Sequence, residues 1–114
     1  MMYDILVIDI RGDVDQSGLE RLRTHLNLKK FGRLTDDWDQ QFGYRRIERT
    51  SGQYTKIVLY REFDGSWQIQ VIDTEELDPK ADNFILLQAE LVAGIAASGY
   101  QPTERAKPTH GTAQ

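Results

Sequence analysis

The sequence contains no cysteine, which excludes a disulfide framework, a thiolate zinc site and thiol chemistry. Only two histidines are present, His25 and His110, too few for a histidine-rich metal site. No stretch approaches the roughly 20 apolar residues that a membrane-spanning helix needs. Residues 1–4 carry no basic group ahead of the first apolar run, so they do not resemble a signal peptide. We therefore expect a cytoplasmic protein.

Recognisable catalytic arrangements are also lacking. The sequence contains no phosphate-binding loop and no dinucleotide fingerprint. A Ser-His-Asp triad would have to use His25, on the flank of a predicted helix, or His110, in a polar tail. With 18 acidic residues in the chain, carboxylate pairs arise by chance and identify no general acid or base. We expect no enzyme activity, no catalytic residue and no cofactor.

The segment I-L-V-I-D-I-R-G, at residues 5–12, resembles the nucleophile strand of haloacid-dehalogenase-like phosphatases. That resemblance implies an aspartate nucleophile at Asp9 and a second acid two residues later. Arg11 stands at the second position instead, and a chain of 114 residues is shorter than that α/β fold requires. We therefore reject a phosphatase activity.

The composition fits one soluble globular domain, with 39% hydrophobic and 28% charged residues. The apolar run at residues 5–10 predicts a buried strand, which ends at Gly12. Ser17, three residues before Glu20, has the spacing of a capping box and predicts the start of a helix. Gly32 is the predicted end of this helix.

Three further runs predict strands, at residues 44–49, 54–63 and 67–72. Asp64 and Gly65 indicate a tight hairpin between the last two. A three-residue loop with Gly65 in the left-handed conformation gives the register that separates apolar from polar side chains. In this register one face carries Ile57, Leu59, Phe63, Trp67, Ile69 and Val71.

A second helix is predicted from Asp78, as N-cap before Pro79, to about Ser98, with Gly99 as its C-terminal cap. This helix is apolar around most of its circumference, so either the first helix covers it or a second copy does, in a homodimer through the last helix. Residues 101–114 are polar and predict a flexible tail after a single domain at residues 1–100.

These elements predict an α+β fold of order β-α-β-β-β-α, with a mostly antiparallel sheet and two helices on one face. The predicted core consists of apolar residues that the strand and helix periodicities place inward. They are Ile5, Val7, Leu22, Leu26, Ile57, Leu59, Trp67, Ile69, Phe84, Leu87, Leu91 and Ile95.

The residues D-V-D-Q-S-G, from Asp13 to Gly18, match the first half of a calcium-binding loop. The match then fails, because Thr24 stands where a bidentate glutamate belongs and a strand precedes the loop. We interpret the segment as a polar strand-to-helix turn and expect no metal site.

Charge is segregated along the chain. Eight acidic residues and a single lysine, Lys80, lie between positions 62 and 90. This segregation predicts an acidic partner-binding patch facing a basic protein surface. The predicted patch consists of Asp73, Glu75, Glu76 and Asp78.

The alternative is a nucleic-acid-binding domain that uses segment 21–54, in which basic and aromatic residues alternate. The candidate residues are Lys29, Lys30, Arg33, Arg45, Arg46, Trp38 and Tyr44. The sequence pI of about 5.1 argues against this alternative, because such domains are usually basic.

The residues D-W-D-Q-Q-F-G, at positions 37–43, resemble a segment of some bacterial toxin-immunity proteins. A match of seven residues is too short to assign a role to any residue of this chain. The sequence most economically predicts a small, acidic, non-catalytic protein-binding module, such as an immunity-type inhibitor, an anti-defence protein or an accessory subunit.

Overall fold

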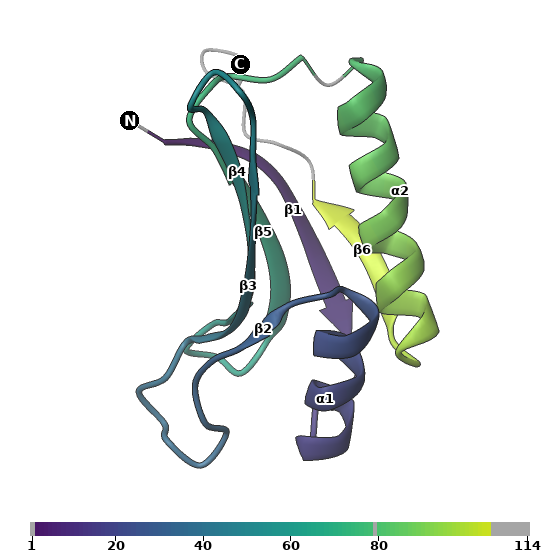
Figure 1. Cartoon of the computed structure of the whole chain (residues 1–114). Coiled ribbons are helices and arrows are strands. Elements are labelled where there is room, and N and C mark those ends of the chain that lie inside the picture. The colour runs from purple at the N-terminus through teal and green to yellow at the C-terminus, as the bar shows by residue number, and fades with distance from the viewer. Residues whose placement is uncertain (1, 79, 106–114) are drawn as a thin grey trace, which may run out of the picture.

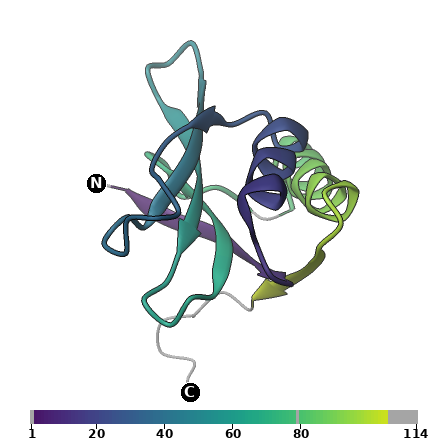
Figure 2. The same ribbon diagram turned by 90° about the horizontal axis from the view of Figure 1, so that it is seen from below.

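The computed structural model describes residues 2–78 and 80–105 (Figure 1). Its elements are β1 (Tyr3–Arg11), α1 (Gln16–His25), β2 (Lys29–Lys30), β3 (Gln41–Glu48), β4 (Tyr54–Arg61), β5 (Trp67–Asp73), α2 (Asp82–Ala97) and β6 (Gln101–Arg105). The strands form one antiparallel sheet in the order β2-β3-β4-β5-β1-β6. Both helices pack on the same face of this curved sheet (Figure 2). The predicted α+β fold is confirmed, with β2 and β6 as additional short strands.

The hairpin of β4 and β5 has the predicted register. Leu59 pairs with Ile69 and Ile57 pairs with Val71, which places all four side chains on the face that the helices cover. Gly65 adopts a φ of 89° in the three-residue loop, a conformation that glycine takes without steric cost. Phe63 departs from the prediction, because it lies beyond the last paired residue and is 88% exposed.

Strand β1 contains a β-bulge that the sequence pattern does not reveal. The register with β5 shifts between Asp4 and Leu6, so the alternation of inward and outward side chains changes phase. As a result Ile8 and Ile10 join Ile5 in the core, and Val7 is only half-buried. The predicted core position of Val7 is therefore wrong.

The core lies between the helices and the covered face of the sheet. Ten of the twelve predicted core residues are buried, and Val7 and Leu87 are the two that are half-buried. Phe42 on β3 is fully buried and packs against Trp67, with ring centroids 4.9 Å apart and ring planes tilted by 55°. Sequence periodicity did not place Phe42 in the core, because β3 begins three residues earlier than predicted.

Both predicted boundaries of α1 need correction. The N-cap is Asp15 and not Ser17, because Asp15 Oδ1 accepts a hydrogen bond of 2.7 Å from the Gly18 amide. The helix ends at His25, well before Gly32, since Asn27 turns into the left-handed region with a φ of 56°. The Leu28 amide then donates back to the Arg23 carbonyl, which completes a Schellman motif.

Helix α2 begins later than predicted, at Asp82. Asp78 is not its N-cap, because the Asp78 carboxylate accepts from the Lys80 amide in a separate turn, while Pro79 lies outside the described residues. The predicted end is confirmed. Gly99 has a φ of 94°, and the Tyr100 amide donates to the Ile95 carbonyl at 3.2 Å.

The first helix covers one side of α2. A Cβ added at Gly94 would lie 2.7 Å from Leu26 Cδ2 and 3.0 Å from the His25 carbonyl oxygen, so glycine permits this close approach. Ile85 and Leu86 remain exposed on the outer side of α2, and a homodimer through this helix stays a prediction. Within residues 2–78 and 80–105, no helix combines the length and the apolar character needed to cross a membrane.

Residues 101–105 do not belong to a flexible tail, as the sequence predicted, but form β6 against β1. Tyr100 anchors this strand, and its hydroxyl donates to the Asp13 carbonyl at 3.0 Å. A Cβ at Gly18 would lie 1.8 Å from the Tyr100 hydroxyl, which explains the glycine in the calcium-like segment. The remainder of the predicted tail, residues 106–114, lies outside the described residues.

Candidate functional site

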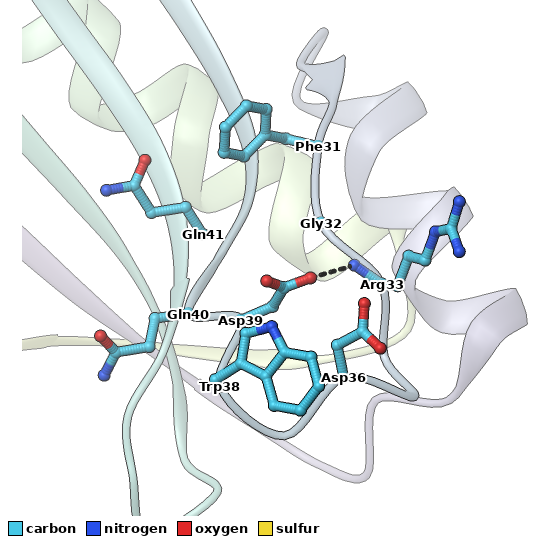
Figure 3. Close-up of a pocket in the computed structure, with 8 residues that line it drawn as sticks. All are labelled: Phe31, Gly32, Arg33, Asp36, Trp38, Asp39, Gln40 and Gln41. Atoms are coloured by element: carbon cyan, nitrogen blue, oxygen red, sulfur yellow. Dashed lines mark hydrogen bonds between the residues drawn. The ribbon is translucent and has the colours of Figure 1, made fainter.

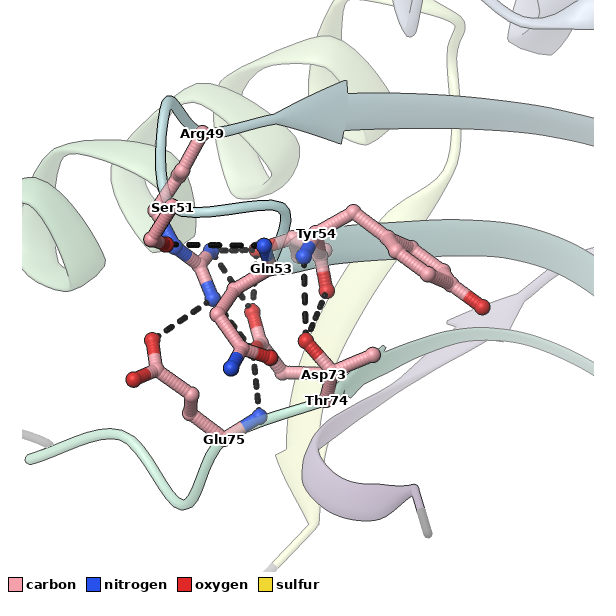
Figure 4. A network of polar contacts seen from close by, with 8 residues as sticks. Arg49, Ser51, Gln53, Tyr54, Asp73, Thr74 and Glu75 are labelled. Carbon is pink, nitrogen blue, oxygen red and sulfur yellow. Dashed lines mark hydrogen bonds and ion pairs between the residues drawn. The ribbon is translucent and has the colours of Figure 1, made fainter.

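The predicted acidic patch contains a residue that no partner can reach. Asp73, at the end of β5, has no exposed surface (Figure 4). Its two carboxylate oxygens accept hydrogen bonds from Arg49 Nη1 at 3.0 Å and Nη2 at 2.6 Å. Asp73 also accepts from the Thr55 hydroxyl and from the Glu75 amide. The carboxylate is therefore a structural group, and its predicted role in partner binding is wrong.

The Asp73 carboxylate is stabilised in its charged form. Burial raises its pKa, but the hydrogen bonds from Arg49 and Thr55 and from the Glu75 amide outweigh burial, so the pKa of Asp73 lies below its usual value. Hydrogen bonding to Asp73 in turn raises the pKa of Arg49. Glu75 pairs with the same guanidinium at 3.0 Å. Of the four predicted patch residues, Glu76 and Asp78 remain as exposed carboxylates outside this network.

The predicted nucleic-acid-binding residues separate in the structure. Lys29, Tyr44 and Arg46 gather on β2 and β3. Arg45 lies between them on β3 and faces the opposite, helix-covered side of the sheet, where its Nη2 pairs with Glu90 at 2.6 Å. Lys30 lies 4.0 Å from Glu20 near α1. The last two, Arg33 and Trp38, belong to the loop between β2 and β3.

Two loops meet at one end of the sheet and expose large aromatic side chains. We call this surface the loop end, comprising residues 31–41 and 62–66 (Figure 1). Trp38 is 77% exposed and Phe63 is 88% exposed. Large aromatic residues are usually mostly buried, so two of them on neighbouring loops form the least expected surface of the molecule.

The longer loop is held from beneath by Arg61 of β4. Arg61 Nη2 donates to the carbonyls of Asp36 at 3.0 Å and Asp39 at 2.9 Å, and Nη1 donates to Leu34 at 3.4 Å. The same guanidinium lies 4.6 Å from the centroid of the Phe42 ring. One half-buried side chain thus satisfies several carbonyls of a segment that lacks regular structure.

A second arginine holds the start of this loop. Arg23 of α1 is buried, and it donates to the Phe31 carbonyl at 2.7 Å and to the Phe42 carbonyl at 2.8 Å. Within the loop, Asp39 Oδ2 accepts from the Arg33 amide at 2.9 Å. The backbone beneath Trp38 is therefore fixed at both ends and in the middle.

Two hollows flank the exposed rings. The larger, of about 640 Å³, has Trp38 on its wall, together with Phe31, Gly32, Arg33, Asp36, Asp39, Gln40 and Gln41 (Figure 3). The smaller, of about 240 Å³, has Phe63 on its wall, together with Asp37, Asp39, Gln40, Arg61, Glu62 and Gly65. Because Asp39 and Gln40 line both hollows, the two form one continuous surface.

The rim of the loop end is acidic. Asp37 lies beside Trp38, and Asp64 lies beside Phe63; both carboxylates are exposed. Hydrogen bonds from the Ser66 side chain and amide lower the pKa of Asp64, so this carboxylate is charged at neutral pH. The acidic patch predicted from the sequence did not include these two carboxylates; its exposed members are Glu75, Glu76 and Asp78.

In the part of the chain that the structure describes, no group of three or more His, Asp or Glu side chains could hold a metal ion. The calcium-like segment is organised differently, with Asp15 capping α1 and the Asp13 carbonyl accepting from Tyr100. No protein-family model matches this chain, and no curated protein and no solved structure matches it.

Proposed function

We propose that this chain is a non-catalytic, cytoplasmic protein-binding module whose partner docks on the loop end. The observation that carries the proposal is the exposure of Trp38 at 77% on a backbone that Arg61 and Arg23 hold in place. Tryptophan is the residue type most enriched at energetic hot spots of protein interfaces. A loop that is already ordered loses little conformational entropy on binding, so more of the contact energy contributes to affinity.

The chemistry of the surface indicates the kind of partner. Trp38 and Phe63 supply two aromatic anchors, and the hollows beside them can receive side chains of the partner. Asp37 and Asp64 at the rim favour a basic partner surface, since opposite charges accelerate the encounter. An immunity-type inhibitor, an anti-defence protein and an accessory subunit would each use such a surface.

The test begins with affinity capture from the native host by the wild-type chain and by Trp38→Ala, followed by mass spectrometry. A protein retained only by the wild type is then purified, and its affinity is measured by calorimetry. We expect Trp38→Ala to weaken binding by about 30-fold or more, the loss that defines a hot spot. Phe63→Ala should weaken the same complex.

Leu86→Ala is the matched control, because Leu86 is 70% exposed but lies on α2, away from both loops. It should bind the partner as the wild type does. The proposal fails if no captured protein depends on Trp38, or if Leu86→Ala loses the same protein equally.

A further inference from the structure

The face of the sheet opposite the helices carries a second organised surface. No helix covers this face within the described residues (Figure 2). Strand pairing places Tyr44 beside Lys29 and Arg46 beside Lys56, and Tyr54 beside Glu48 at the end of the same face. We define the aromatic-basic stripe as Lys29, Tyr44, Arg46, Lys56 and Tyr54, with Phe31 at its border. The stripe crosses β2, β3 and β4.

Cations and rings alternate along the stripe at contact distance. The ammonium groups of Lys29 and Lys56 each lie 5.8 Å from the centroid of the Tyr44 ring. Phe31 meets Tyr44 edge to face at 6.2 Å and remains 51% exposed. An open hollow of about 600 Å³ adjoins these groups and is lined by Lys29, Tyr44 and Arg46, among others. This arrangement offers both positive charge and aromatic surface to one ligand.

Arg46 forms the most specific feature of the stripe. Its guanidinium lies 3.6 Å from the centroid of the Tyr54 ring, and its side chain is still 48% exposed. The ring beneath holds the guanidinium in place while part of the side chain stays open to solvent. A planar cation held in this way can stack against the π-face of a nucleobase.

We infer that the aromatic-basic stripe binds single-stranded nucleic acid. In this arrangement the positive charges of Lys29, Lys56 and Arg46 neutralise phosphates, and a base stacks on the Arg46–Tyr54 pair. Proteins that bind single strands without sequence preference combine a positively charged track with stacking platforms in this way. This binding site shares Phe31 with the loop end, but its cations and its tyrosines lie on β2, β3 and β4, and it goes beyond the proposed protein-binding function.

The acidic composition of the chain does not oppose this assignment, because the acids lie elsewhere. Asp73 and Glu75 are paired with Arg49, and Asp9 is paired with Arg105 at the β1–β6 edge of the sheet, away from β2, β3 and β4. Glu48 is the acidic residue that borders the stripe, and its carboxylate contacts Arg46 Nε at 3.0 Å. Three cations against one carboxylate leave this surface locally positive.

An acidic protein segment would also be attracted to three cations, and its carboxylates could pair with Arg46, but they have no π-face to stack on the Arg46–Tyr54 pair as a base does. The experiment therefore compares two probes by fluorescence anisotropy, a labelled oligo(dT) of about 15 nucleotides and a labelled polyglutamate peptide. The full chain should bind the oligonucleotide with log affinity falling against log salt at a slope of about −2, as expected for three neutralised phosphates on a single strand.

Two variants separate charge from stacking. Lys56→Gln should reduce the magnitude of the salt slope by about 0.7. Arg46→Lys keeps the charge and the slope but removes the planar group, so affinity should fall about 5-fold or more, the lower bound for one stacked base. Arg33→Gln is the matched control, because Arg33 is an exposed arginine outside the stripe, and it should bind as the wild type does.

Absence of oligonucleotide binding overturns the inference. Equal binding of polyglutamate, with Arg46→Lys behaving as wild type, also overturns it and assigns the stripe to an acidic protein. Trp38→Ala should leave oligonucleotide binding unchanged, so failure at the stripe and failure at the loop end are distinguishable.

Discussion

The two ends of the sheet use an arginine in different ways (Figure 1). At the end with the β3–β4 turn, Arg49 binds a buried carboxylate (Figure 4). At the opposite end, Arg61 binds backbone carbonyls. Both arginines are half-buried; Arg49 directly follows β3, and Arg61 is the last residue of β4. The partner of Arg49 is a side chain, Asp73, so the two charges neutralise each other. The partners of Arg61 belong to the main chain of residues 34–39, so the side chains of that loop remain available to other molecules.

This difference supports our proposal that a partner docks on the loop end. An ion pair between side chains removes an acid from the surface and contributes to folding. Main-chain contacts fix a loop without using its side chains, which is the condition for presenting Trp38 and Phe63 in a defined position. The count of charged residues at the two ends is therefore a poor guide to which end binds a partner.

The largest effect should come from breaking the ion pair. Asp73→Ala removes the carboxylate that Arg49 and Thr55 share. We expect the free energy of unfolding to fall by about 3 kcal/mol, the lower part of the range for a broken buried pair, because Arg49 retains Glu75 and some access to water. Urea denaturation measures this loss.

Glu76→Ala is the control within the same acidic run, and it should change the free energy of unfolding by less than about 0.5 kcal/mol. If the two variants were equally stable, Asp73 would not be the structural carboxylate of this end.

A smaller effect is expected at the other end. Arg61→Met keeps the aliphatic packing on Phe42 and Trp67 but removes the donors to the Leu34, Asp36 and Asp39 carbonyls. We expect the free energy of unfolding to fall by about 1–3 kcal/mol, the cost of leaving partly buried acceptors unsatisfied. Amide hydrogen exchange should accelerate within residues 33–40 more than in α2, because the loop loses its support.

Arg33→Met provides the comparison for Arg61→Met. The Arg33 side chain is exposed, and its contacts within the loop are made by its backbone, whose amide donates to Asp39 and whose carbonyl accepts from the Asp36 amide. It should leave both stability and exchange near wild type. Uniform acceleration of exchange across the molecule in Arg61→Met would show that Arg61 supports the whole fold rather than the loop.

The sequence predicted well what neighbouring residues determine. The register of β4 and β5 follows from a period of two on both sides of Asp64 and Gly65, and the end of α2 follows from Gly99. Local patterns did not predict contacts between distant residues. Arg49 and Asp73 are 24 residues apart, and Arg105 and Asp9 are 96 apart, so neither the buried carboxylate nor β6 could be inferred from spacing.

The candidate site was predicted only in part. Trp38 was singled out among basic residues of segment 21–54, but the three-dimensional structure separates it from Lys29 and Arg46. The sequence pattern assigns Phe63 to the apolar face of the hairpin, because the alternation of β4 extends past Arg61 into the turn; the structure instead exposes it. A tryptophan within a segment that has no helical or strand periodicity was the signal for an exposed anchor.

The smallest expected effect is the change in stability at low pH, and it tests the same Arg49–Asp73 ion pair. The pKa of Asp73 is lowered in the folded chain, since the hydrogen bonds from Arg49 and Thr55 outweigh the opposing effect of burial. A lowered pKa stabilises the folded state at every pH above the unfolded value of about 3.9. That contribution is lost as the pH falls through the lower pKa of the folded state.

The stability difference between the wild type and Asp73→Asn should therefore be constant near neutral pH and shrink below about pH 4. Urea denaturation at a series of pH values measures the difference, and Glu76→Gln, which removes an exposed carboxylate of the same acidic run, should show no such convergence. A gap that stayed constant or widened in acid would mean that Arg49 does not stabilise the charged form of Asp73.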